Sequence, residues 1–276
     1  MTDDWLRTTT RPVKIIRVDA TAPNLARVWN YMVGGRDNFE ADRAAARKLL
    51  AAAPVMADVA QASRAFLRRV VRFLAAEAGI RQFLDIGTGI PAAGSTHELA
   101  QAVDPASRIV YVDNDPIVLA HARALMTSDP AGATAFIQAD LHDPVKILDD
   151  PALRRTLDLG EPVALMLIAI MMYIRNDENP HGLVSTLMDA LPSGSYLALT
   201  HATADFNREE AGSAVASSEQ GGIPFAMRGQ AAVAAFFDGL DLVDPGVVPL
   251  PAWHPEGALP DEPRAVYFYG AVGRKP

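Results

Sequence analysis

The stretch "RQFLDIGTGIPAAGSTHELAQ", from Arg81 to Gln101, joins an apolar run to a carboxylate, two glycines and a segment of helical character. The apolar run predicts a buried strand, and Ser95 with Glu98 predicts a capping box that begins a helix. Gly87 and Gly89 can adopt backbone angles that are closed to other residues, so that a ligand can touch the main chain between strand and helix. We therefore expect a ligand at this strand end rather than a plain turn.

The sequence on either side of this stretch shows two different periodicities. Residues 23–79 place apolar side chains at i, i+3 and i+4, which predicts helices. From residue 81 onward, short apolar runs alternate with helical segments, and this order is typical of a parallel sheet covered on both faces. The expected strands are residues 82–87, 108–113, 134–140, 162–171 and 195–201, followed by two closely spaced strands at 240–250 and 265–273. One of the last two is expected to be antiparallel.

These patterns predict two parts. Residues 1–79 form an N-terminal arm, up to about residue 20, and a helical cap, whereas residues 80–276 form the ligand-binding domain. The longest apolar run begins at Val163 and is too short to span a bilayer, which needs about 20 residues. The N-terminus has no apolar signal-peptide segment. We therefore expect a cytoplasmic protein without a membrane partner.

Composition excludes several classes of chemistry. The 276 residues include no cysteine, so disulfides, zinc–thiolate sites and cysteine nucleophiles are impossible. The six histidines lack the spacing of metal ligands, and no metal is expected. The net charge of −8 does not favour nucleic acid. The dense basic group, consisting of Arg64, Arg68, Arg69 and Arg72, has helical spacing and is interpreted as a solvated or salt-bridged helix face.

Two further carboxylates extend the ligand site suggested by the opening stretch. Asp113 ends the second expected strand, 26 residues after Gly87, where it can accept both hydroxyls of a ribose. Asp140 ends the third, where it can accept a hydrogen bond from an exocyclic amine, with Leu141 beside the base. Each acid alone also suits a helix cap or a turn. Together with the glycines they indicate a nucleoside.

The residues of the loop after the first expected strand favour some nucleotide ligands over others. "GIPAAGST", from Gly89, resembles a phosphate loop, but Ser95 stands where the phosphate-binding lysine is needed. The helix begins too late after Gly87 to hold the pyrophosphate of a dinucleotide, although a nicotinamide or flavin enzyme remains an alternative. S-adenosylmethionine has no phosphate and carries positive sulfonium and ammonium groups. Three acids suit it, with Asp85 facing the ammonium.

Several long stretches of the sequence resemble those of a known protein family. They are "ARVWNYMVGGRDNFEADR" (26–43), "RAFLRRVVRFLAAEAGIRQFLDIGTGIP" (64–91), "HELAQ" (97–101), "RIVYVDNDPIVLAHARALM" (108–126), "GSYLALTHAT" (194–203) and "FFDGLDLVDPGVV" (236–248). The chain resembles, over nearly its whole length, the actinobacterial S-adenosylmethionine-dependent methyltransferases long catalogued as a domain of unknown function. The resemblance implies a class I methyltransferase fold, a Rossmann-like seven-stranded, mostly parallel sheet whose last strand is antiparallel, preceded by helices that cover the cofactor.

The resemblance also implies that "YMVGGRDNF", residues 31–39, belongs to the site, although a plain loop is the alternative. It further implies S-adenosylmethionine as cofactor. The expected cofactor-binding residues are Asp85, Gly87, Thr88, Gly89, Asp113, Asn114, Asp140, Leu141, Arg36 and Asn38. Family members often carry histidine at the end of strand four. Met172 stands there in this chain, so a base at that position is absent.

Residues on the acceptor side carry less specific patterns. His201, at the end of the fifth expected strand, is the best candidate for a general base, with a structural histidine as the alternative. The candidate substrate pocket consists of Tyr31, Phe39, Met172, Tyr173, Asp205 and Arg228. We expect a methyltransferase for a small-molecule acceptor. The alternatives are a non-catalytic regulator that binds the cofactor and an NAD- or FAD-binding oxidoreductase. Neither the acceptor nor the oligomeric state follows from the sequence.

Overall fold

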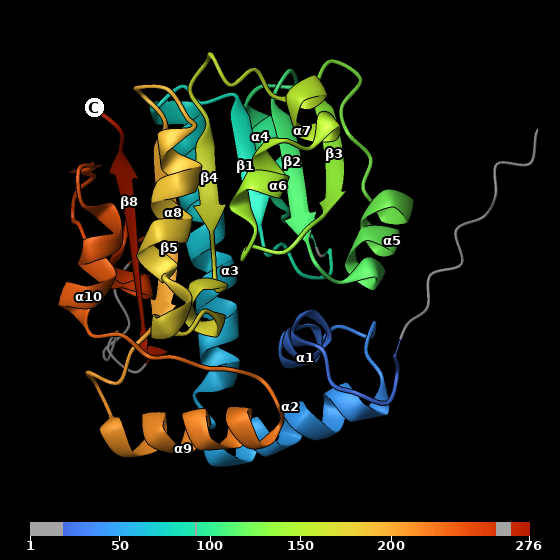
Figure 1. Cartoon of the computed structure of the whole chain (residues 1–276), viewed down its shortest axis with the longest axis vertical. Helices are drawn as coiled ribbons and strands as arrows, with labels where there is room; N and C mark the ends of the chain where they lie inside the picture. The colour runs from blue at the N-terminus through green and yellow to red at the C-terminus, as the bar shows by residue number, and fades with distance from the viewer. Residues whose placement is uncertain (1–18, 92, 258–265) are drawn as a thin grey trace, which may run out of the picture.

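A computed structural model describes residues 19–91, 93–257 and 266–276. It contains a twisted central sheet with helices on both faces, and further helices lie across one end of the strands (Figure 1). The N-terminal arm expected up to about residue 20 lies almost wholly outside the described residues. Within the described ranges, no helix is both long and apolar enough to cross a bilayer.

Within the part of the chain that the structure describes, the sheet has eight strands in the order β3-β2-β1-β4-β5-β8-β6, and β7 pairs with β8. The parallel strands are β1 (Gln82–Ile86), β2 (Arg108–Asp113), β3 (Ala133–Gln138), β4 (Ala164–Leu167) and β5 (Tyr196–Ala202). They confirm the five strands expected from the apolar runs, although β4 ends earlier than expected. β8 (Phe268–Arg274) runs antiparallel to β5, as expected for the last strand.

The expected strand at residues 240–250 is divided, which gives eight strands instead of seven. β6 (Asp241–Leu242) and β7 (Val248–Pro249) both pair antiparallel with β8. Between them Pro245 has no N–H to donate, and Gly246 adopts a positive φ of 80°. The chain therefore turns where the apolar pattern suggests continuity.

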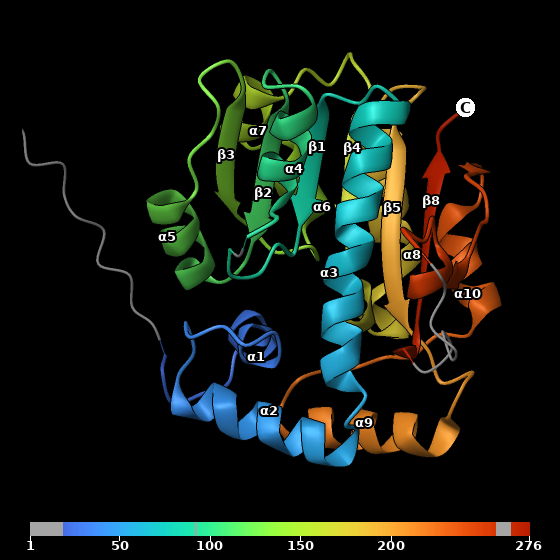
Figure 2. The ribbon, with the colours of Figure 1, turned by 180° about the vertical axis from the view of Figure 1, so that it is seen from behind.

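Helices form a layer on each face of the sheet. α3 (Met56–Arg72), which continues as a π-helical turn (Phe73–Glu77), lies with α4 (Thr96–Val103) on one face (Figure 2). The other face carries α6 (Pro144–Leu148), α7 (Pro151–Thr156), α8 (Pro180–Asp189) and α10 (Gln230–Ala234) (Figure 1). α5 (Pro116–Leu125) contacts β2 and β3.

Every residue of β1 is buried, because the strand is covered on both faces. Successive side chains point to opposite faces of a strand, so Phe83 belongs to the core under α3 and Leu84 to the core on the other side. This double burial explains why β1 is apolar from Phe83 to Ile86 except at Asp85. Asp85 is a buried carboxylate inside this apolar stretch, which points to a role at the site.

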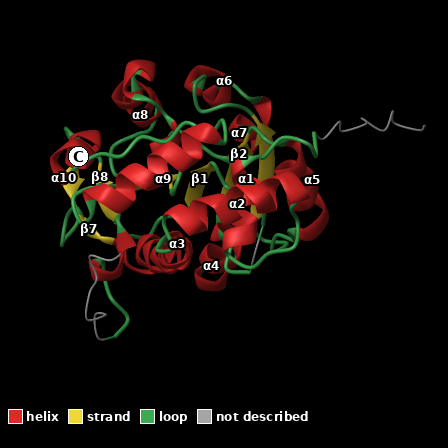
Figure 3. Cartoon of the chain, turned by 90° about the horizontal axis from the view of Figure 1, so that it is seen from below, coloured by secondary structure: helices red, strands yellow, loops and turns green. Residues whose placement is uncertain are grey.

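Three helices lie across the carboxyl ends of the parallel strands. They are α1 (Leu25–Met32), α2 (Glu40–Ala52) and α9 (Arg208–Gln220), and α2 packs against α9 (Figure 3). The Asn24 side chain caps α1, and the chain leaves that helix through Gly34, with a φ of +82°. The helices expected between residues 23 and 79 are therefore confirmed.

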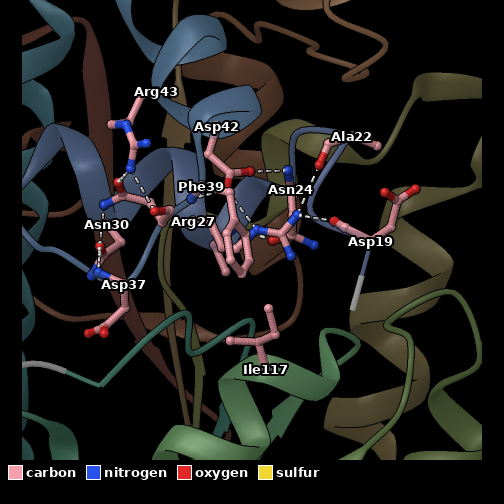
Figure 4. A network of polar contacts seen from close by, with 12 residues as sticks. Asp19, Ala22, Asn24, Arg27, Asn30, Asp37, Phe39, Asp42, Arg43 and Ile117 are labelled. Carbon is pink, nitrogen blue, oxygen red and sulfur yellow. Dashed lines mark hydrogen bonds and ion pairs between the residues drawn. The ribbon is translucent and has the colours of Figure 1, made fainter. Parts of the chain in front are cut away.

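A buried ion pair joins these helices to the sheet domain (Figure 4). Arg27 Nε donates to Asp42 Oδ2 at 2.8 Å, and the two side chains are 5% and 0% exposed. Asp42 also accepts the backbone N–H groups of Asn24 and Phe39, each at 2.8 Å. Arg27 Nη1 lies 3.5 Å from Asp115, the N-cap of α5. One arginine therefore connects α1, α2 and α5.

Replacing Arg27 is expected to show how much the fold depends on this buried ion pair. Arg27→Ala leaves the buried Asp42 carboxylate without its cation, so we expect a loss of about 3–5 kcal/mol in the free energy of unfolding. Arg154→Ala is the matched control. Its pair with Asp149 is exposed, at 57% and 66%, and its loss is expected to stay below about 1 kcal/mol. Urea unfolding measures both, and equal losses would contradict the assignment.

Candidate functional site

The strand order reverses between β1 and β4, and a cavity lies at that point. In open α/β sheets, ligands bind outside the carboxyl ends of the strands at such a reversal. The cavity has a volume of about 380 Å³. Its walls come from the ends of β1 to β4, from α1 and α3, and from residues 222–224 after α9.

The turn after β1 brings bare backbone to the cavity. Gly87 and Gly89 have φ angles of +76° and +63°, which L-residues with side chains rarely adopt. A Cβ atom built on Gly87 would lie 2.7 Å from Ile170 Cγ1, whereas one on Gly89 would meet nothing within 4 Å. The N–H of Gly89 donates to Asp113 Oδ2 at 2.9 Å. The two predicted halves of the motif are thus in direct contact.

Asp85 is a buried carboxylate at the floor of this turn. Its Oδ2 accepts a hydrogen bond of 2.6 Å from Thr96 Oγ1, at the first residue of α4. Burial raises the pKa of Asp85 to about 6, although the Thr96 hydroxyl and the charge of Arg64 oppose the shift. Burial also lowers the pKa of Arg64, which lines the same cavity from α3. The Arg64 guanidinium and the Asp85 carboxyl therefore lie on the same part of the cavity wall.

Helix α4 begins at the expected residue, but its cap differs in detail. The Glu98 carboxylate accepts the N–H of Gly94, at 2.7 Å, one residue earlier than the expected contact with Ser95. Gly94 also lies beside α3, since a Cβ atom built on it would lie 3.9 Å from Cδ of the Arg68 side chain.

Asp113 ends β2 and is also buried. Its Oδ1 accepts the N–H of Asp115 and its Oδ2 that of Gly89, both at 2.9 Å. Burial raises the pKa of Asp113 to about 6, against the effect of these hydrogen bonds. The helix-cap alternative does not describe Asp113, since Asp115 caps α5. The Asp113 carboxylate instead faces the cavity.

Asp140 lies at the third strand end, within a polar group that includes Asn114 and His142. Asn114 Nδ2 donates to Asp140 Oδ2 at 3.1 Å, and His142 Nδ1 lies 2.6 Å from Asp140 Oδ1. Partial burial opposes ionisation, but these hydrogen bonds and that of the His142 N–H lower the pKa of Asp140 overall. For His142, burial alone would lower the pKa. The nearby carboxylates of Asp140 and Glu178 have the larger effect, so the pKa of His142 is raised overall. Leu141 lines the cavity beside this group.

Most of the expected cofactor residues therefore meet in one place. The structure brings to the cavity wall Asp85, Gly87, Thr88, Gly89, Asp113, Asn114, Asp140 and Leu141, and also Tyr173 from the expected substrate set. The cavity also contains Ser63 and Arg64, which the sequence did not predict for the site, because what a helix face contacts is a property of the tertiary structure. The spacing of the basic residues alone does not distinguish Arg64 from its solvent-facing neighbour Arg68.

The segment 31–39 does not line the cavity. Asn38 Nδ2 donates to Asn30 Oδ1 at 2.9 Å and to Gly35 O at 3.1 Å, so the Asn38 side chain closes its own loop. The Phe39 ring lies 5.3 Å below the Arg27 guanidinium, and Arg36 is exposed. Tyr31 packs against the core on the α3 side. Three of these expected site residues, Tyr31, Asn38 and Phe39, therefore pack or hydrogen bond away from the cavity.

His201 and Arg228 also lie outside the cavity. His201 is completely buried, its Nδ1 donates to the Ala202 carbonyl at 2.8 Å, and its Nε2 accepts from Arg228. Burial lowers the pKa of His201 to about 4, and the positive charge of Arg228 adds to this effect. This neutral histidine is not among the residues that line the cavity. Arg228 further binds the carbonyls of Met171 and Ile174.

Two other expectations need correction. Met172 does not end strand four, because β4 stops at Leu167 and Met172 lies in a short 3-10 helix (Met171–Tyr173) with its side chain wholly buried. Asp205 lies away from the cavity, where its Oδ2 accepts the N–H of Gln230 at the start of α10. The long apolar run hides the end of β4, since the strand and the buried turn after it are equally hydrophobic.

Comparison with known proteins shows the relationship directly. The profile of the family described as S-adenosyl methyltransferase matches residues 12–276. A DUF574 family protein from Streptomyces avermitilis is 45% identical, with 94% of this chain and 100% of that chain covered and a TM-score of 0.91. A Thermobifida fusca protein assigned as a methyltransferase is 38% identical, with coverages of 93% and 96% and a TM-score of 0.86. Among curated proteins, none matches.

The sheet order, the antiparallel last strand and the glycine turn define a class I methyltransferase fold. This chain belongs to the S-adenosyl methyltransferase family and is an S-adenosylmethionine-dependent methyltransferase, with S-adenosylmethionine as its cofactor. An O-methyltransferase family protein from Burkholderia thailandensis, 14% identical with a TM-score of 0.53, shares the fold alone; the match covers 80% of this chain and 58% of that one.

The two glycines of the turn are expected to tolerate substitution differently. Gly89→Ala adds left-handed backbone strain of about 1–2 kcal/mol. Gly87→Ala adds the same strain and a clash with Ile170, for which overpacking contributes about 1–3 kcal/mol more. Thermal unfolding of the ligand-free variants measures the difference. A Gly87 variant as stable as the Gly89 variant would contradict the close packing of this turn.

Proposed function

We propose that the cavity at the ends of β1 to β4 is the methyl-transfer site, and that the acceptor is a small molecule. The observation that carries this proposal is the convergence of Asp85, Asp113 and Asp140 with the bare turn at residues 87–89. The cavity is bounded on its outer side by α1 and residues 222–224. That space suits a nucleoside beside a small acceptor better than a polymer.

The residues present fit S-adenosylmethionine. Two buried carboxylates with raised pKa values, Asp85 and Asp113, lack enough donors to offset their burial. The Asp85 Oδ1 atom accepts no hydrogen bond from the described residues, and we assign it to the ammonium of the cofactor. Arg64, near Asp85, is placed for the carboxylate of the same amino-acid group.

The nucleoside is assigned to the other strand ends. Each oxygen of Asp113 accepts one backbone N–H and retains a lone pair for a ribose hydroxyl. Asp140, with a lowered pKa, stays ionised and suits an exocyclic amine, with Leu141 beside the base. The turn at residues 87–89 lets the main chain approach between them. Thr88 and Asn114 complete this wall, whereas Arg36 and Asn38 have no place in it.

Methyl transfer needs alignment and the exclusion of water more than it needs a base, because the methyl group of a sulfonium is already activated for displacement. We propose that the cap within residues 1–79 supplies the cover and that residues 80–276 supply the cofactor wall. α3 is shared, since it packs on the sheet and also carries Arg64. The role of His201 as a base stays a prediction that its contacts do not support.

Thermal unfolding with candidate ligands tests the site. A ligand at 100 times its dissociation constant stabilises by about 2.7 kcal/mol, which corresponds to about 5–10 °C for a chain of this size. We expect this shift with S-adenosylmethionine and S-adenosylhomocysteine, but not with NAD, FAD or ATP. Asp113→Asn is expected to abolish most of the shift, whereas the surface variant Asp149→Asn keeps it. A larger shift with NAD would overturn the cofactor assignment.

The raised pKa values of Asp85 and Asp113 predict a pH dependence with two opposite signs. The ionised carboxylates bind the ammonium and the ribose, so affinity for S-adenosylhomocysteine is expected to fall as the pH drops through about 6, by up to about tenfold per unit for each acid. The stability of the ligand-free protein is expected to change with pH in the opposite direction. Protonation of these acids stabilises the fold, fully below pH 3.8, and this contribution is lost as the pH rises through about 6.

Titration calorimetry between pH 5 and 8 measures the first effect, and urea unfolding of the ligand-free protein measures the second. Asp85→Asn is expected to flatten the pH dependence of binding. An affinity that is independent of pH in the unsubstituted protein would remove both carboxylates from the cofactor site.

A further inference from the structure

The cavity has an uncharged half. The charged or basic side chains among its lining residues are Arg64, Asp85, Asp113, Asp140 and His142. The acids and the histidine lie at or just beyond the ends of β1, β2 and β3, and Arg64 is close enough to Asp85 to affect its pKa. The rest of the wall is apolar or neutral, and includes Leu25, Trp29, Leu67, Ile168, Ile170 and Ile223.

Part of this uncharged wall lies beside β4, on the far side of the strand reversal, whereas Leu25 and Trp29 come from α1. Ile168, Ile170 and Tyr173 follow β4 directly, and α3, which carries Leu67, passes in front of β4 in Figure 2. The proposed cofactor residues occupy the β1–β3 side. Space next to β4 is therefore available to a second molecule.

Two hydroxyl groups of residues that line the cavity have no hydrogen-bond partner among the described residues. Ser63 is 3% exposed, and its buried Oγ is one of them. Buried polar groups are nearly always paired, so an orphaned hydroxyl on a cavity wall points to a ligand. The hydroxyl of Tyr173 hydrogen bonds with none of the described residues. Burial raises the pKa of Tyr173, which keeps it a neutral donor.

The aromatic rings favour a flat ligand. Trp29 and Tyr173 both line the cavity, and Tyr173 is itself supported by Phe225, with ring centroids 5.7 Å apart. Aromatic faces pack against planar partners with a gain beyond simple burial. A charged ligand group next to these rings would lose its hydration without a counterion, which costs far more than a hydroxyl that meets Ser63 or Tyr173.

We propose that the methyl acceptor is an uncharged, planar aromatic molecule with a hydroxyl group, which Ser63 Oγ and Tyr173 Oη bind in the β4 half of the cavity. This inference rests on the proposed function, because that function assigns the other half of the cavity to the cofactor. To the proposed function it adds the chemical class of the acceptor and two residues that bind it. Ser63 and Tyr173 position the acceptor and are assigned no proton transfer.

Three probes of nearly equal shape test the charge of the acceptor. They are 4-ethylphenol, which is neutral, 4-hydroxyphenylacetate, which is an anion, and tyramine, which is a cation. Binding is measured by calorimetry to the full chain saturated with S-adenosylhomocysteine. We expect 4-ethylphenol to bind at least about tenfold more tightly than either charged probe, a difference of about 1.4 kcal/mol.

Two variants test the hydroxyls. Ser63→Ala and Tyr173→Phe are each expected to weaken 4-ethylphenol about three- to tenfold, as for a lost hydrogen bond, and to leave the affinity for S-adenosylhomocysteine unchanged. Ligand-free Ser63→Ala should unfold at the same temperature as the unsubstituted protein or higher, because the hydroxyl has no partner to lose. The controls are Ser185→Ala, on the exposed face of α8, and Tyr196→Phe, at the amino end of β5.

The outcomes separate this inference from the proposed function. Failure to bind S-adenosylhomocysteine would overturn the site itself. Tight binding of S-adenosylhomocysteine combined with equal binding of the three probes, or with no binding of 4-ethylphenol, would overturn the acceptor class alone. A Ser63→Ala variant that loses S-adenosylhomocysteine and retains 4-ethylphenol would assign that hydroxyl to the cofactor.

Discussion

The hydrogen bond between the N–H of Gly89 and the carboxylate of Asp113 is the contact on which the site depends. It ties the turn after β1 to the end of β2 and requires a left-handed backbone at Gly87 and Gly89. The same turn packs against Ile170 after β4, so three neighbouring strand ends are fixed together. The cavity exists because these strands stop there and their connections diverge to opposite faces of the sheet.

Burial of charge is the second constraint. Asp85 and Asp113 are held at a point where water is largely excluded, and their raised pKa values show that the protein alone does not compensate them. Arg27 and Asp42 are buried as well, but they form a saturated network that joins the cap to α5. Comparable burial thus gives a structural ion pair at Arg27 and Asp42 and the proposed binding site at Asp85 and Asp113. The difference is the number of donors supplied.

Sequence reasoning succeeded where a residue's environment follows from its own strand or turn. The five parallel strands, the antiparallel β8, the glycine turn and the strand-end acids follow from short apolar runs and local chemistry. It failed where a side chain's partner is distant in sequence. His201 ends its strand as expected, yet Arg228, 27 residues later, occupies its Nε2. It also failed at Asn38, for a different reason: this side chain was expected at the cofactor, yet it binds nearby residues, Asn30 of α1 and Gly35 of its own loop.

The sequence by itself determined the order of strands and helices along the chain, the class of cofactor and the carboxylates at the strand ends, because these depend on periodicity and on residues close to a strand end. The tertiary structure decided which face of α3 meets the cavity, and so brought Ser63 and Arg64 to it while Arg68 stays exposed. It also decided that the wall beside β4 is uncharged. Helical spacing shows that residues share a face, but only packing shows what that face contacts.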